Sequence, residues 1–586
     1  MIHCPPLPGR NNVHDGSCWR QAEVGLQREF ELGSPAQDIE VVPGSQQSIS
    51  HNILGLQITI NLYWFSITDN HPHSAGGVYT SFNNLHCGVY FLQHNVTLLN
   101  HSIKPFVVNF KRVYSGVLMD ICSCPTPWRV RNALAMTTSD VPASHKLNAK
   151  AGHSHKVHTC DQCFVMLEEV NLPSSYDIPN FHLCEDFSQL SHVYQSKYAT
   201  TAAARKKIVN KFGYCPVLCS PTDPVHNLFG IVGHFHNEIL IPGHFLNKAA
   251  WRKFQDNINA IIWPSQIGQL PTNNNNIHTD SPAVPPNTKM PPDIDCCLNK
   301  MFELVLFLLT ATRLLTSHSN SMYDVDQGQQ LLQQYCHTAL TMQIHLVINH
   351  HLSMHYAPFF KNFGPVYAWW LFAFEHFNGL LKQVNLNGHA GSIMELTLIF
   401  QQIPNLYTLT LDHTIITWPT LNLGHKHMVD KMPFFAEGSA KFHPFIMKDG
   451  NHYGCTSATQ TDADAFAFVA LQGAWIPCQF VTHLKLSTPN EKPHFCSVIR
   501  HFAAGGDMPI MPWDLYATDL GYYLSYANTF HNIEIIPSST IASPIAIVPT
   551  YSQVIKKDVW ISVSFDRSGV EPLDQSFNEG KDDTVL

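Results

Sequence analysis

Near the N-terminus, the apolar positions of this chain have the spacing of short strands. From residue 53 to about residue 136, β-branched and aromatic residues form brief runs between turn residues. Such side chains fit the pleated, half-buried surface of a sheet. The pattern predicts strands over residues 56–65, 88–92 and 105–113.

A helical spacing replaces this pattern from about residue 190. Apolar positions three to four residues apart predict a helix over 227–240. Helical segments resume over 298–384 after a break. Within them, Pro365 predicts the start of a helix over 366–382, because proline suits the first helical turn.

Short strands return from about residue 441, for example at 480–486 and 545–548. Because a single core stops growing at about 250 to 300 residues, the 586 residues predict more than one domain. An Asn- and Pro-rich segment, about residues 271–297, is predicted to be a linker or a surface excursion. We expect a poorly ordered lead-in at 1–50, a core at 51–435 and a β-rich C-terminal domain at 436–586.

Charge is scarce in this composition. Charged residues make up 13% of the chain, where about 25% is usual, so neutral polar side chains must form much of the surface. The 35 basic and 44 acidic residues give a net charge of -9, which argues against strong nucleic-acid binding. The best basic run is Arg205-Lys206-Lys207, and such a run is usually a solvated helix face.

Neither secretion nor membrane insertion is expected. Prolines interrupt residues 1–10, where a signal peptide would have its apolar region. The most apolar run, residues 301–312, is too short to span a bilayer. The 16 Cys are therefore better interpreted as thiols or metal ligands than as a disulfide framework.

Three segments carry the candidate chemistry, namely residues 56–65, 134–163 and 349–381. In order and spacing, over roughly residues 50–570, the chain resembles the transposases of CACTA-type (En/Spm) DNA transposons in their fungal form, which are related to the Kyakuja-Dileera-Zisupton group. The resemblance implies an α/β fold: a ribonuclease H-like core with a large helical insertion, followed by the β-rich domain. In that family two strand aspartates and one helix glutamate surround two divalent metal ions, Mg²⁺ or Mn²⁺, which cleave and join DNA strands.

Asp140 matches the second acid of this family, because residues 134–139 form a predicted strand that ends at it. Taken alone, Asp140 would be better interpreted as a turn residue before Pro142, but the Cys-x-x-Cys pair that follows at the family's distance favours the acid. Glu375 matches the third acid, and its motif of aromatic residues is the most specific match in the chain. Its alternative role is that of a solvent-facing residue on an amphipathic helix.

The position of the first acid is occupied by Tyr63. A neutral phenol, with a pKa near 10, cannot replace an anionic metal ligand at neutral pH. Asp69 is the nearest candidate for rescue, but six residues of continued strand would displace its carboxylate by about 20 Å. The resemblance therefore implies a degenerate copy without catalytic activity.

A second set of residues matches a zinc site of the family: Cys160, Cys163, His351 and His355. A helix would present the two histidines on one face, and a Cys₂His₂ set suits tetrahedral zinc. Free buried thiols and ordinary helix histidines are the alternative. His350 is an alternative ligand if the helix register differs.

Asp223 and His226 match a further family motif at the start of a helix. Asp223 followed by Pro224 is also a good helix cap, and we favour that role. His226 would then orient a ligand of the metal site without binding the metal itself. Residues 210–223 form a shorter stretch than the family usually has, which indicates a deletion.

By resemblance, the partners would be transposon-end DNA and the location the nucleus, with an oligomer possible. A different hypothesis is a non-enzymatic, zinc-stabilised scaffold that binds DNA or protein. A third is a decaying element whose product folds poorly.

Overall fold

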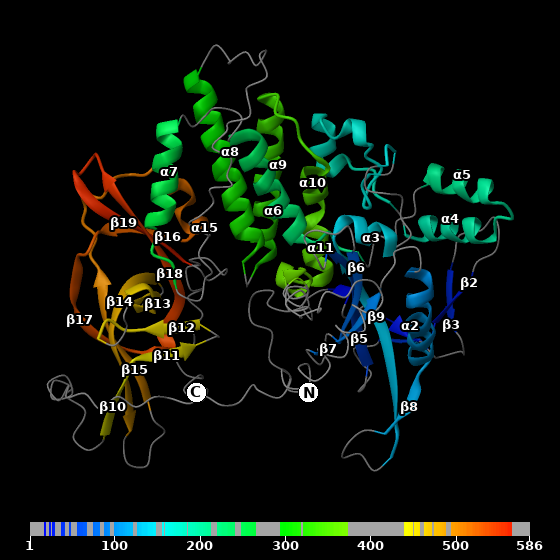
Figure 1. Cartoon of the computed structure of the whole chain (residues 1–586), viewed down its shortest axis with the longest axis horizontal. Helices are drawn as coiled ribbons and strands as arrows, with labels where there is room; N and C mark the ends of the chain where they lie inside the picture. Colours follow the sequence, from blue (N-terminus) through cyan, green and yellow to red (C-terminus); the bar gives the residue numbers. More distant parts are fainter. Residues whose placement is uncertain are drawn as a thin grey trace, which may run out of the picture. The chain divides into compact units, whose positions relative to one another are not determined.

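The structure is a computed structural model, and Figure 1 shows the whole chain. The chain folds into two compact units, one of residues 1–236 and 319–414, the other of residues 237–318 and 415–586. This division groups residues 237–318 with the C-terminal sheet, whereas the sequence pattern grouped them with the core. The structure describes residues 17–18, 23–24, 26–29, 37–40, 46–48, 55–66, 74–82, 87–93, 99–120, 126–147, 155–157, 159–184, 186–212, 220–240, 248–264, 294–317, 320–372, 375, 439–448, 451–457, 462–471, 474–487 and 494–564.

The first unit contains a mixed five-stranded sheet in the order β7-β6-β5-β9-β8. β5 is antiparallel to β6 but parallel to β9, so the carboxyl ends of β5 and β9 lie at the same edge. The strands are β5 (Gly55–Ser66), β6 (Ser74–Phe82), β7 (Cys87–Gln93), β8 (Val117–Met119) and β9 (Trp128–Ser139).

One predicted strand of this region is wrong. Residues 105–113 lie in helix α2 (Leu99–Tyr114). The β-branched and aromatic residues suggested a strand, but they also fit a helix in which Phe110, Val113 and Tyr114 are half-buried and Val108 is exposed. The segment belongs to the connection between the parallel strands β5 and β9, and such a crossover connection is usually helical.

The predicted lead-in contains two short antiparallel strand pairs, β1 (Glu23–Val24) with β4 (Gln47–Ser48), and β2 (Leu26–Glu29) with β3 (Gln37–Glu40). The predicted linker falls mostly outside the described residues, but its last four positions belong to α8 (Ile294–Leu315). Asp69 also lies outside them.

Helices make up most of the remainder of the first unit. Their core is aromatic: Tyr335, Phe359, Phe360 and Trp369 are almost fully buried. The elements are α3 (Val141–Leu147), η4 (Leu167–Glu169), η5 (Pro173–Tyr176), η6 (Ile178–Asn180), α4 (Asp186–Tyr198), α5 (Ala202–Phe212), α6 (Pro224–His234), α9 (Met322–Thr341), α10 (Ile348–Leu352), η8 (Ser353–His355), α11 (Tyr356–Phe363) and η9 (Val366–Ala368). The π-helix η7 (Phe235–Leu240) follows α6, and its last four residues are assigned to the second unit.

The predicted helix over 366–382 does not begin at Val366 as a regular α-helix. A 3₁₀ turn, η9, comes first, and the helical bond from the Glu375 N–H to the Leu371 carbonyl follows later. Burial of Trp369 accounts for the delay: its indole N–H donates to the Gly364 carbonyl at 3.1 Å while its ring contacts the aromatic core. The chain therefore turns before it becomes helical.

The second unit is built on an eight-stranded antiparallel sheet in the order β16-β19-β18-β13-β14-β15-β17, with β10 also paired to β14. The predicted strands 480–486 and 545–548 lie within β14 and β18, so the β-rich C-terminal region is confirmed. The strands are β10 (Ser439–His443), β13 (Phe466–Leu471), β14 (Ala474–Ser487), β15 (His494–Phe502), β16 (Tyr522–Tyr526), β17 (Phe530–Pro537), β18 (Ile541–Ser552) and β19 (Lys557–Ser564), with the separate pair β11 (Phe445–Lys448) and β12 (Asn451–Gly454).

Helices contact this sheet within the second unit. α7 (Lys248–Ala260) contacts β18, and the chain after it forms a bridge between Ile262 and Ile547. α8 contacts the short helix α15 (Ala517–Leu520). The remaining turns are η10 (Asp462–Ala465), η11 (Asp514–Tyr516) and η12 (Ser538–Thr540). In the parts of the chain that the structure describes, no helix combines the length and apolar character that crossing a bilayer requires.

Candidate functional site

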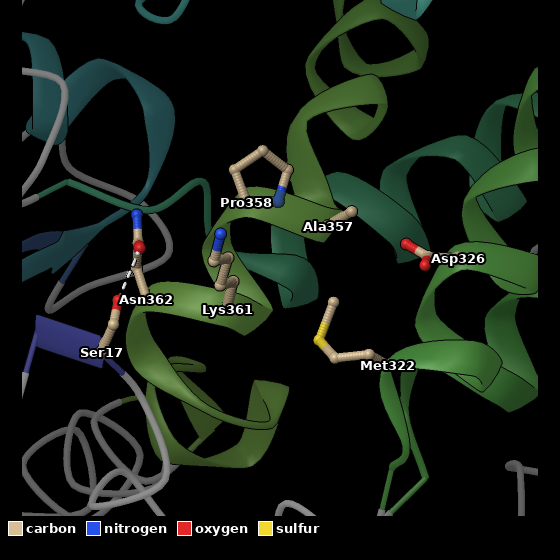
Figure 2. Close-up of a pocket in the computed structure, with 7 residues that line it drawn as sticks. All are labelled: Ser17, Met322, Asp326, Ala357, Pro358, Lys361 and Asn362. Atoms are coloured by element: carbon tan, nitrogen blue, oxygen red, sulfur yellow. Dashed lines mark hydrogen bonds between the residues drawn. The ribbon is translucent and has the colours of Figure 1, made fainter.

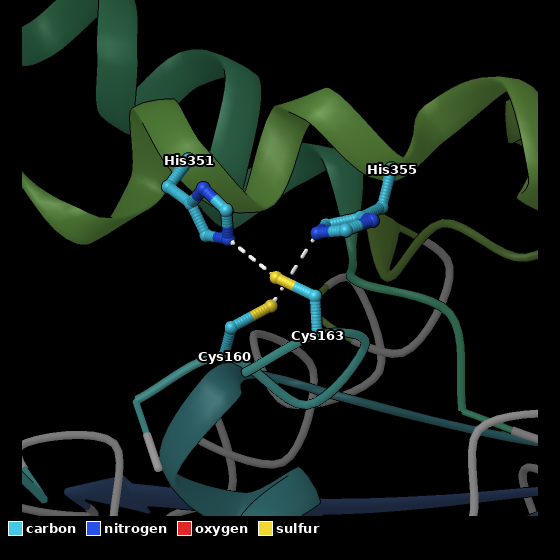
Figure 3. Close-up of side chains that lie close together, drawn as sticks. All are labelled: Cys160, Cys163, His351 and His355. Atoms are coloured by element: carbon cyan, nitrogen blue, oxygen red, sulfur yellow. Dashed lines mark hydrogen bonds between the residues drawn. The ribbon is translucent and has the colours of Figure 1, made fainter. Parts of the chain in front are cut away.

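Four side chains from two distant segments meet in a buried cluster, which we call the Cys/His cluster: Cys160, Cys163, His351 and His355. Figure 3 shows both cysteines reaching from a loop towards two histidines above them. Cys160 Sγ lies 3.4 Å from His355 Nε2, and Cys163 Sγ lies 3.1 Å from His351 Nε2. The four ligand atoms all lie within 4.8 Å of one another, although the halves are 188 positions apart.

These distances are close to those around a tetrahedral metal ion. Zn–S bonds of about 2.3 Å and Zn–N bonds of about 2.0 Å imply ligand atoms about 3.3 to 3.8 Å apart. Small movements would bring the cluster into that range. The site can therefore hold a metal such as zinc.

The surroundings of the cluster suit this role. The Nδ1 of His351 lies 2.7 Å from the Ser175 carbonyl, so an Nδ1–H donated there leaves Nε2 directed at the sulfurs. The Gln162 N–H donates to Cys160 Sγ at 3.3 Å. Phe181 covers both histidine rings.

Without a metal, the Cys160 thiol would be protonated at neutral pH. Burial, followed by the neighbouring Cys163, raises the pKa of Cys160 to about 11. A bound cation would instead favour the thiolate, because metal ligands must be deprotonated. His350, the alternative ligand, is not part of the cluster: its Nδ1 lies 3.1 Å from the Val347 carbonyl and its ring stacks on Tyr335.

Asp140 follows the last residue of β9, as predicted. Its Oδ1 accepts the Ala143 N–H at 2.7 Å, and its carbonyl accepts the Ser144 N–H at 2.8 Å. The residue therefore begins α3, in line with the turn interpretation. This bond uses one carboxylate oxygen and is compatible with a second role for the other.

Tyr63 lies in β5, opposite Gly77 of β6. The parallel register of β5 and β9 pairs Leu62 with Ser139. The next residue on each strand is Tyr63 on one and Asp140 on the other. The backbone therefore places Tyr63, three residues before the end of β5, beside Asp140, which directly follows β9.

Asp223 joins two segments, and its side chain is almost fully buried. Its Oδ2 accepts the His226 backbone N–H at 2.9 Å, which confirms the predicted helix cap of α6. Its Oδ1 accepts the Leu371 N–H at 3.0 Å, at the entrance to the turn that carries Glu375. One carboxylate thus fixes α6 to the segment of the third predicted acid.

His226 lies between two carboxylates. Its Nδ1 is 2.6 Å from Asp223 Oδ2, and its Nε2 is 3.0 Å from Glu375 Oε1. The hydrogen bond to Asp223 raises the pKa of His226, burial opposes it, and the negative charges of Asp223, Glu375 and Asp140 raise it further. The two predicted acids Asp140 and Glu375 therefore act on the same imidazole, and we call Asp140, Asp223, His226 and Glu375 the acidic cluster.

α6 connects the two clusters through residues that were not among the predicted site residues. Asn227 donates to the Asn349 carbonyl at 2.8 Å and accepts from the Tyr356 hydroxyl at 2.7 Å, next to the histidine ligands. A Cβ at Gly230 would lie 2.5 Å from Asn349 Nδ2, so a larger residue there would have to displace the Asn349 amide, which donates to the His226 carbonyl at 3.2 Å. The sequence held one signal for Asn227, namely a polar residue among the buried apolar positions of α6.

A separate cavity of about 520 Å³ lies in the first unit between α9 and α11. Figure 2 shows Asp326 and Met322 on one side of it and Lys361 on the other. The Ser17 hydroxyl donates a hydrogen bond to Asn362 Oδ1 at 2.9 Å. None of the predicted site residues lines it.

No family model matches this chain, and no curated protein matches it. The geometry of the two clusters therefore carries the functional argument.

Proposed function

We propose that this chain is a transposon-derived protein with a ribonuclease H-like core, descended from a metal-dependent DNA transposase of the CACTA type and without its strand-cleavage activity. The observation that carries the proposal is that His226 contacts Glu375 at 3.0 Å and that the negative charge of Asp140 also raises the pKa of His226, with Tyr63 on the strand beside Asp140. DNA of the transposon ends and the nucleus are the partner and location that the proposal implies.

The arrangement of the acids supports the ancestry. Asp140 ends one of two neighbouring parallel strands, and Glu375 has a helical backbone bond. Two strand ends and one helix are the elements that hold the three acids in the resembled family. Mg²⁺ or Mn²⁺ bound there would activate the attacking oxygen and stabilise the leaving oxygen.

Tyr63 supports the loss of activity. A site for two divalent cations needs several anionic oxygens, and a phenol stays neutral at pH 7. In this chain, Asp140 and Glu375 would supply carboxylates while His226 would hold a proton between Asp223 and Glu375. The remaining acids are thus partly neutralised by a residue of the chain itself.

A nicking assay on transposon-end DNA with Mg²⁺ or Mn²⁺ tests the proposal. We expect no cleavage by the natural chain and measurable cleavage by Tyr63→Asp, because the substitution restores the missing carboxylate. Tyr63→Asn is the matched control, since its side chain has the size of aspartate without the charge. Cleavage by the natural chain that disappears in both Asp140→Ala and Glu375→Ala would refute the proposed inactivity.

A zinc-stabilised, non-enzymatic scaffold is the second candidate, and the completeness of the Cys/His cluster favours it. The two candidates differ in the expected result for Tyr63→Asp: the first predicts DNA cleavage by this variant, and the scaffold predicts none. One zinc ion per purified chain, with no cleavage from either the natural chain or Tyr63→Asp, would support the scaffold alone.

A further inference from the structure

The one strongly basic stretch that the proposed function leaves unused lies on α4 and α5. Residues 187–222 contain five Lys and Arg and no Asp or Glu, in a chain of net charge -9. The basic residues are Lys197, Arg205, Lys206, Lys207 and Lys211. A local excess of positive charge in an acidic chain makes this stretch a candidate for contact with an anionic partner.

α4 and α5 pack against each other as a helical hairpin (Figure 1). The ring of His192 on α4 stacks on Phe212 of α5 at 3.7 Å between centroids, which fixes the face of α5 that is turned inwards. At the connection, Thr201 caps α5 by accepting the Ala204 N–H, and Arg205 donates to the Ala199 carbonyl. The hairpin is therefore held by its own contacts.

The outer side of α5 is cationic. Lys206, Lys207 and Lys211 are exposed, and their spacing puts them on one side of the helix. The Lys211 ammonium also lies 4.7 Å from the centre of the Phe212 ring. Within the described residues, no carboxylate forms an ion pair with Lys206 or Lys207. Lys207 and Lys211 are one turn apart, as i,i+4 neighbours, so their charges reinforce each other on this side of the helix.

Lys197 extends this surface at the end of α4. Its ammonium lies 5.6 Å from the centre of the Tyr194 ring and 5.2 Å from that of Tyr198. The two rings stack on each other, and Tyr198 is 60% exposed. A lysine beside an exposed aromatic ring is a combination used by surfaces that bind nucleic acid, single strands above all.

We infer that the α4–α5 hairpin is a contact surface for the phosphate backbone of DNA. From Lys206 to Lys211 the helix rises about 7.5 Å, a length that corresponds to about two phosphates of one strand. The positive charge argues for a polyanion, while its identity as DNA rests on the proposed function. Backbone contacts of this kind fix position on a duplex without reading its sequence.

Fluorescence anisotropy of the full chain with a labelled random-sequence DNA duplex tests the inference. The variant Lys206→Gln/Lys207→Gln/Lys211→Gln should weaken binding at least about tenfold and reduce the slope of log K against log salt by about 2 to 3. A control with the same charge change, Lys253→Gln/Lys441→Gln/Lys556→Gln, removes exposed lysines of the second unit and should leave binding nearly unchanged. Replacement of the three α5 lysines by Arg should preserve it.

Equal losses in the two glutamine variants, or no loss in either, would overturn the inference. So would a chain that ignores the duplex but binds phosphatidylserine vesicles through the same lysines, since the surface would then recognise a membrane. Equal thermal melting of all variants excludes unfolding as the cause. A failed nicking experiment with Tyr63→Asp would count against the proposed function and leave the anisotropy result intact.

Discussion

The Cys/His cluster and the acidic cluster of the first unit both join segments that are far apart in the chain, but they differ in completeness. The Cys/His cluster has four ligands, all buried, with one histidine oriented by a backbone carbonyl. The acidic cluster keeps two of three expected acids and has an imidazole between the carboxylates of Asp223 and Glu375. Under the proposed function, this contrast means that the part that stabilises the fold is retained while the part that performs chemistry has changed.

Removal of a Cys/His ligand should have the largest effect. We expect His351→Gln to abolish stoichiometric zinc binding and to lower the free energy of unfolding by several kcal/mol, because metal binding contributes directly to folding. His345→Gln, an exposed histidine nearby, should keep both properties. Metal analysis and urea denaturation measure the two effects, and full zinc content in His351→Gln would show that the cluster is only a set of buried thiols and histidines.

Asp223→Ala should have the next largest effect, because it leaves the His226 and Leu371 N–H groups without their acceptor. We expect a loss of about 2 to 3 kcal/mol in the free energy of unfolding. Thr201→Ala removes an exposed cap of α5 and should cost about 1 kcal/mol or less. Equal costs in urea denaturation would mean that Asp223 is an ordinary helix cap.

Tyr63→Asp should increase the affinity of the acidic cluster for Mn²⁺ at least about tenfold, equivalent to about 1.4 kcal/mol. The added carboxylate favours Mn²⁺, which prefers oxygen ligands. Titration of the zinc-loaded chain with Mn²⁺, followed by electron paramagnetic resonance, measures the change. Tyr63→Phe is the control, and equal affinities in Tyr63→Asp and Tyr63→Phe would contradict the assignment of Tyr63 to the missing acid.

The protonation of His226 should give the smallest effect. Its raised pKa means that the folded chain holds this proton above pH 6.5, the ordinary histidine pKa. The resulting stabilisation is full below that pH and is lost as the pH rises through the folded-state pKa. Nuclear magnetic resonance of the ring should show a lower His226 pKa in Glu375→Gln, and no change would remove Glu375 as a partner.

Residues close together in sequence predicted the local structure well. The strand ending at Asp140 and the cap at Asp223 follow from strand patterning and from the Asp-Pro pair, both of which act within a few residues. The failure at residues 105–113 came from tertiary position, since a run of Val and Phe suits a strand or an amphipathic helix.

Long-range partners could not be derived in this way. In the sequence, only the resemblance to a family indicated that Cys160 and His355 share a site. In the structure, Cys160 Sγ lies 3.4 Å from His355 Nε2. Nothing in the sequence indicated that Asp223 would accept the Leu371 N–H across 148 positions. Such bonds depend on how whole helices pack, and no local pattern records that.

The shared register of β5 and β9 has an evolutionary consequence. Because Leu62 pairs with Ser139, an aspartate at position 63 would stand beside Asp140 without any change in strand alignment. A tyrosine codon becomes an aspartate codon through a single base change. If the proposed function is right, the scaffold has kept its ancestral alignment, and a single point mutation would return the lost side chain to it.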